Sequence, residues 1–139
     1  MPFREKSAWI TLLSVLLCFG VYFGALATGR IERFGMSALH YAFVSIIALV
    51  ILQVVLHVVA AISNPQDARA PRDEREIMFA YRSRSIGYYF LMLWMVGIIV
   101  AVHFRAVQKL DVVFIAWLGV ATAIMVVALV QIVQYRRGA

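Results

Sequence analysis

Residues 38–62, ALHYAFVSIIALVILQVVLHVVAAI, decide the fold class of this chain, because they contain no Asp, Glu, Lys or Arg. A helix of about 20 predominantly apolar residues is long enough to cross the hydrocarbon core of a bilayer. Three other segments have the same character, so the expected spans are residues 8–28, 38–62, 85–104 and 112–134. The sequence therefore predicts an all-α integral membrane protein, residues 1–139, with four transmembrane helices in one domain.

The overall composition supports this class. Of the 139 residues, 64% are apolar and only 14% are charged, whereas a soluble domain is about half apolar and a quarter charged. A small soluble domain could not bury so much apolar surface. The formal charge of +6 does not indicate a nucleic-acid partner here, because basic residues at the ends of membrane helices contact anionic lipid headgroups. Membrane lipids are the partners that we expect.

The connections predict the topology. Residues 29–37 and 105–111 are too short for a folded domain, so spans one and two, and spans three and four, are expected to form antiparallel hairpins. Nine of the 13 Lys and Arg residues lie at the two termini or in residues 63–84. Basic residues favour the cytoplasmic side of a membrane. Both termini and the central loop are therefore predicted to be cytoplasmic.

The central loop, residues 63–84, is the largest polar segment. Asn64-Pro65 and Ala70-Pro71 disfavour helix at its start. An acidic beginning and a basic end then favour a helix over residues 73–84, either lying on the membrane surface or continuing into the third span. Its charges and exposed apolar side chains make this loop the best candidate surface for a cytoplasmic protein partner. The candidate residues are Arg72, Asp73, Glu74, Arg75, Glu76, Phe79, Arg82 and Arg84.

Two histidines suggest an alternative. His40 and His103 are expected near the outer ends of spans two and three, and two histidines at similar depth on neighbouring helices could ligate a haem. Met36 lies four residues before His40 and would suit a copper site. Nothing in the spacing resembles a dedicated metal motif, so interfacial histidines bonded to backbone, water or headgroups are favoured, and no cofactor is expected.

Small residues recur at intervals of four in three segments: Gly20, Gly24 and Thr28; Gly97 and Ala101; and Gly119 and Ala123. Such spacing allows two helices to approach closely. Packing within one chain is the favoured interpretation, and homo-oligomer formation is the alternative.

No catalytic constellation is apparent, and no Asp, Glu, Lys or Arg falls within the four expected spans. Ion-coupled transport usually requires such a group at membrane depth, so secondary transport is disfavoured. The leading hypothesis is a non-enzymatic protein whose central loop recruits or restrains a cytoplasmic protein. The alternatives are a haem- or copper-binding protein and a small channel or lipid/small-molecule transporter with a neutral path between the hairpins.

The segment before the third span carries a resemblance. It contains Asp73-Glu74-Arg75-Glu76, then an Arg/Ser-rich helix start at residues 82–85, and then Tyr88-Tyr89. In this it resembles a group of small four-span bacterial membrane proteins that have no established activity. The resemblance covers the four-span layout and is specific over residues 72–89. It implies a bacterial inner membrane and no particular reaction.

Overall fold

Four long helices account for most of the chain. The computed structural model describes residues 3–32, 35–63, 65–66, 70–71, 73–104 and 111–137. The helices are α1 (Phe3–Ala27), α2 (Met36–Ser63), α4 (Glu74–His103) and α5 (Asp111–Arg137). All four are long and apolar enough to cross a membrane. The predicted all-α class with four span-length helices is confirmed, and the described residues contain no strand.

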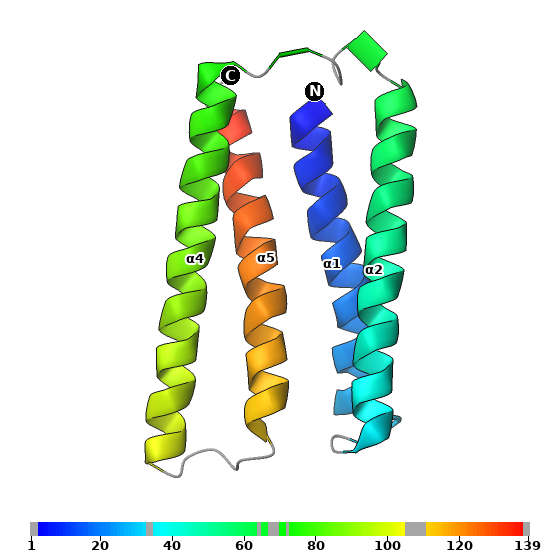
Figure 1. Ribbon diagram of the computed structural model, residues 1–139, viewed down its shortest axis with the longest axis vertical. Coiled ribbons are helices and arrows are strands. Elements are labelled where there is room, and N and C mark those ends of the chain that lie inside the picture. Colours follow the sequence, from blue (N-terminus) through cyan, green and yellow to red (C-terminus); the bar gives the residue numbers. More distant parts are fainter. Residues whose placement is uncertain are drawn as a thin grey trace.

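The helices lie side by side in the order α4, α5, α1, α2, and both chain termini are at the same end (Figure 1). The close packing is between α1 and α2, between α1 and α5, and between α4 and α5. The outer sides of α2 and α4 therefore have no neighbouring helix. Only three residues are buried on each of them, against eight on α1. Apolar side chains on these outer sides, such as Val54 and Ile99, are available to lipid.

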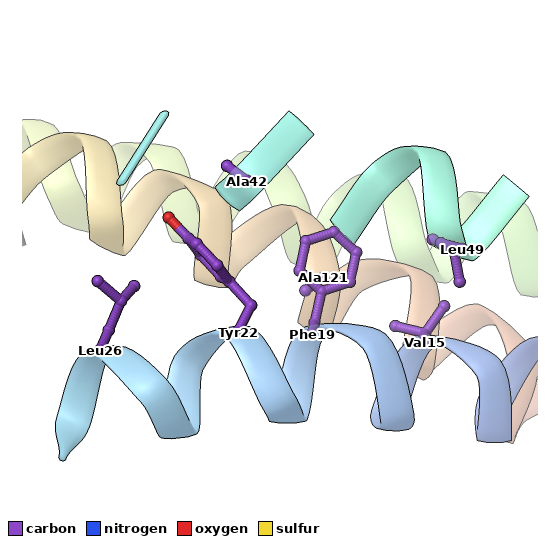
Figure 2. Close-up of a cluster of buried hydrophobic side chains, with 7 residues drawn as sticks. All are labelled: Val15, Phe19, Tyr22, Leu26, Ala42, Leu49 and Ala121. Carbon is purple, nitrogen blue, oxygen red and sulfur yellow. The ribbon is translucent and has the colours of Figure 1, made fainter. Parts of the chain in front are cut away.

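The main core is centred on α1, as Figure 2 shows. Val15, Phe19, Tyr22 and Leu26 follow one another at intervals of three or four residues, which places them on one face of the helix. This face packs against α2 and α5, from which the core takes three buried residues, Ala42, Leu49 and Ala121. The two alanines are small and allow the helix backbones to approach closely.

A positive-φ glycine follows the end of α1. Thr28 donates a side-chain hydrogen bond to the Gly24 carbonyl, at 2.9 Å, and the Arg30 N–H donates to the Ala25 carbonyl, at 3.0 Å. Gly29 has a φ of 70°, a left-handed conformation that residues with a Cβ adopt at a cost. The chain leaves the helix axis at this point and turns toward α2.

The third span and the preceding loop helix form one continuous helix, which decides between the two alternatives for residues 73–84. Asp73 is extended, with φ −70° and ψ 151°, and α4 then runs from Glu74 to His103 without a break. Its 30 residues correspond to about 45 Å at about 1.5 Å per residue. The hydrocarbon core is only about 30 Å thick. About ten residues of α4 therefore project beyond the hydrocarbon core. The charged residues lie at the beginning of the helix.

The glycines expected at helix contacts divide into two groups. A Cβ on Gly119 would lie 2.2 Å from Cδ1 of Trp94, so this glycine is where α5 meets α4. Nothing lies within 4 Å of a Cβ built on Gly20, Gly24 or Gly97. The favoured role of these three in packing within one chain is therefore wrong, because they lie on exposed helix surfaces. Gly97 instead lines an apolar groove of about 460 Å³ between α4 and α5.

A close approach that the intervals of four did not reveal occurs at Gly87. A Cβ there would lie 2.2 Å from Cγ2 of Val127. Gly87 is buried on α4 and marks the contact between α4 and α5 near the charged end.

Candidate functional site

Polar contacts at the end that carries both termini join all four helices. Arg4, in the first turn of α1, forms an ion pair with Glu76 of α4, with 2.7 Å between Nε and Oε2. Each side chain is only about one-fifth exposed, at 22% and 23%. Arg4 also donates a hydrogen bond to the Ala70 carbonyl, at 3.4 Å. The start of α1 is thereby attached to the start of α4 and to the segment that precedes it.

The neighbouring residue joins α1 to α5. Glu5 is buried, with 7% of its surface exposed, and Arg136 donates from Nε to its Oε1 at 3.5 Å. The Arg136 guanidinium carbon also lies 5.5 Å from the ring centroid of Trp9, a distance suited to a cation–π interaction. A buried carboxylate is costly without a charged or hydrogen-bonding partner, so Arg136 holds the end of α5 close to α1.

A serine–histidine hydrogen bond joins α1 to α2. Ser7 Oγ and His57 Nε2 are 2.8 Å apart, and His57 Nδ1 is 2.7 Å from the Gln53 carbonyl oxygen. The carbonyl oxygen can only accept, so Nδ1 donates to it, and in the neutral imidazole Nε2 accepts a hydrogen bond from the Ser7 hydroxyl. The sequence places Gln53 and His57 on one face of a helix, but it does not identify Ser7 as the partner.

Two further contacts join α4 to α5. The rings of Phe79 and Tyr135 meet edge to face, with centroids 5.6 Å apart. One helical turn deeper, Gln131 Nε2 donates to Ser83 Oγ at 3.1 Å, and Ser83 donates to the Ala80 carbonyl at 3.0 Å. Ser83 is fully buried. These contacts fix the position of the charged part of α4 on the rest of the protein.

The structure separates the candidate partner-binding residues into groups. Glu76 and Phe79 face inward and make the contacts above. Asp73, Glu74, Arg75, Arg82 and Arg84 are exposed, and Arg72 lies outside the described residues. Arg82 lines a groove between α4 and α5. The contribution of Arg4, Glu5, Ser7 and Trp9 was missed, because a short polar leader before an apolar run carries no signal for these contacts.

The outward side of the first fifteen residues of α4, Glu74–Tyr88, is a mixed apolar and polar stripe that begins in the projecting part of the helix. It consists of Glu74, Ile77, Met78, Tyr81, Ser85 and Tyr88, spaced at intervals of one to four residues, and we call it the outer stripe. This spacing places its members on one helix face, opposite the buried Ser83 and Gly87. Met78 and Tyr81 are 63% and 74% exposed. Large apolar side chains are therefore presented beside exposed charges.

The candidate cofactor residues are not brought together. His40 lies on α2 beside Tyr41, and His103 lies at the end of α4 beside Phe104. These two helices occupy opposite ends of the row (Figure 1). Met36 is the first residue of α2 and is highly exposed. Within the described ranges, no three His, Cys, Asp or Glu side chains are grouped so as to hold a metal ion.

No protein-family model matches the chain, and no curated protein or solved structure matches it either. The chain's own features that bear on function are the polar contacts at one end, the outer stripe and the grooves between α4 and α5.

Proposed function

We propose that this chain is a non-enzymatic, multi-pass protein of the bacterial cytoplasmic membrane, and that the beginning of α4 recruits or restrains a cytoplasmic protein. In this proposal the chain crosses the membrane as two antiparallel hairpins, α1–α2 and α4–α5, with both termini in the cytoplasm. The excess of Lys and Arg at this end supports the orientation. The resemblance over residues 72–89 supports a bacterial membrane.

The outer stripe is the observation that carries the proposed role. α4 is longer than the hydrocarbon core is thick, so its first turns lie at or beyond the headgroups. Ile77, Met78 and Tyr81 are exposed there, where neither helices nor hydrocarbon cover them. Exposed apolar and aromatic side chains rimmed by polar residues are typical of protein-interaction surfaces.

Rigid attachment of the stripe also favours binding. Glu76 and Phe79, on the opposite side of the same turns, are held by Arg4 and Tyr135. A partner would therefore meet a helix whose conformation is already fixed, and it would pay little of the ordering cost that a flexible loop imposes. Because the chain is anchored in the membrane, a bound partner would also be confined to the membrane surface.

The test is site-specific photo-cross-linking in cells from position 81. The matched control places the same cross-linker at Leu93, which is equally exposed, at 73% against 74%, but lies within the apolar part of α4. We expect a discrete cross-linked protein from position 81 that is absent from position 93 and is lost when Met78 is replaced by Asp. Cross-linking only to lipid from both positions would contradict the proposal.

The two alternative functions receive no comparable support. A haem or copper site within one chain would need His40 and His103 to approach each other, and they lie on α2 and α4. A path enclosed by helices would need neighbours on the outer sides of α2 and α4 (Figure 1). Both alternatives remain predictions without a structural observation in their favour.

A further inference from the structure

A groove between α4 and α5 combines two arginines with an apolar wall. It has a volume of about 540 Å³ and lies at the end of the protein that carries the polar contacts. It is lined by Phe79, Arg82, Ile86, Leu129, Val130, Val133, Gln134 and Arg137. We propose that this groove binds one anionic phospholipid, with its headgroup at the arginines and the beginning of an acyl chain along the apolar wall.

The charges of the groove fit this ligand. The nearby carboxylates of Glu76 and Glu5 form ion pairs with other arginines, Arg4 and Arg136 respectively. Within the described part of the chain, neither Arg82 nor Arg137 forms an ion pair. A guanidinium carries only donors, and it matches the acceptor oxygens of a phosphodiester in a bidentate arrangement. The groove therefore offers positive charge that no side chain described here neutralises.

The depth of the two arginines fits a lipid headgroup better than a small free anion. The Phe79–Tyr135 and Ser83–Gln131 contacts set the register between α4 and α5. In this register Arg137 lies about five residues nearer the helix ends than Arg82, or about 8 Å at about 1.5 Å per residue. Two donors separated along the membrane normal can reach the phosphate and the acyl-ester carbonyls of one phospholipid. A free phosphate ion is too small to contact both arginines at this separation as a phospholipid would.

The remaining walls fit the rest of the molecule. Ile86, Leu129 and Val133 are 38%, 45% and 45% exposed and face the groove with hydrocarbon, as an acyl chain requires. Gln134 is a further polar group of the lining, and its side-chain oxygen is buried without a partner among the described residues. A headgroup hydroxyl or ammonium would supply the missing donor after a small rotation of this amide.

This inference rests on the proposed membrane location of the chain, but not on the protein partner or on the orientation. The experiment is native mass spectrometry of the detergent-purified protein with added phosphatidylglycerol or phosphatidylcholine. We expect one phosphatidylglycerol to bind more tightly than phosphatidylcholine, and R82Q and R137Q each to weaken it about fivefold, the value of one basic residue at an anionic headgroup.

Matched variants make the test specific. Arg84 lies two residues from Arg82 but outside the groove, so R84Q should leave phosphatidylglycerol binding unchanged. V133W fills the groove without changing any charge and should also displace the lipid. Equal binding of the two lipids, an effect of R84Q as large as that of R82Q, or full displacement by millimolar inorganic phosphate would overturn the inference. M78D, which disrupts the outer stripe, should leave lipid binding unchanged. Failure of the protein-partner proposal is therefore separable from failure of the lipid proposal.

Discussion

Replacement of Gly119 by Ala is expected to destabilise the protein, although alanine is intrinsically the better helix former. The new Cβ would lie 2.2 Å from Cδ1, 2.4 Å from Nε1 and 2.9 Å from Cγ of Trp94. These atoms belong to a rigid ring that cannot bend away. The ring is also fixed by a hydrogen bond from Nε1 to the Ile115 carbonyl, at 2.9 Å. Relief of the clash must therefore move the whole side chain or separate α4 from α5.

The magnitude follows from these contacts. Overpacking of a tightly packed site typically costs about 1–3 kcal/mol, and loss of the Trp94 hydrogen bond costs about 0.6 kcal/mol in a membrane protein. The gain from replacing Gly by Ala within a helix is about 1 kcal/mol. The free energy of unfolding should accordingly fall by about 1–2 kcal/mol.

Gly97 is the matched control, since it also lies in a helix but has nothing within 4 Å of a Cβ. Gly97→Ala should leave stability unchanged or slightly raise it. The assay is thermal unfolding of the two purified variants in the same mild detergent, followed by circular dichroism. Equal melting temperatures for G119A and the unmodified protein would show that α4 and α5 do not meet at Trp94 as described.

Two further predictions concern the polar contacts. Arg4→Gln and Glu76→Gln should show a coupling free energy of about 1 kcal/mol in a double-mutant cycle, smaller at high salt because the pair is partly exposed; no coupling would mean that α1 and α4 are not joined there. Ser83→Ala should lower the free energy of unfolding by about 1 kcal/mol, because it removes the acceptor of the Gln131 amide. The control Ser85→Ala, at an exposed position on the same helix, should have little effect. Equal effects of the two substitutions in denaturant titrations would refute the role of Ser83.

The sequence was sufficient to predict the helices because the absence of charge over about 20 residues is a local property with one main structural consequence. The continuous extension of α4 back to Glu74 was one of two alternatives. An acidic start and a basic end favour a helix, but they do not show whether it lies on the membrane surface or continues into the third span. Side-chain contacts between helices were harder to predict. In a segment apolar on all sides, periodicity does not show which face meets a neighbour, and so Gly20, Gly24 and Gly97 were expected at contacts that they do not make.

The candidate site was predicted in part. Clustering of charge identified residues 63–84 as the polar region, but it did not show that Glu76 and Phe79 face inward. Their partners, Arg4 and Tyr135, are distant in the sequence, and no local pattern connects them. The groove formed by Arg82 and Arg137 likewise depends on the register of two helices, which composition does not encode.

Chemical labelling of position 81 determines whether the beginning of α4 projects into the cytoplasm. Cys18 is the only cysteine of the chain, so Cys18→Ser gives a background for single cysteines at Tyr81 or Leu93, which are exposed to the same extent. With a membrane-impermeant maleimide, Tyr81→Cys should react only after the cells are permeabilised, and Leu93→Cys should not react in either case. Labelling of position 81 in intact cells would reverse the orientation. If the cysteine at position 81 reacted neither in permeabilised cells nor in purified membranes stripped of peripheral proteins, the beginning of α4 would not project into the cytoplasm.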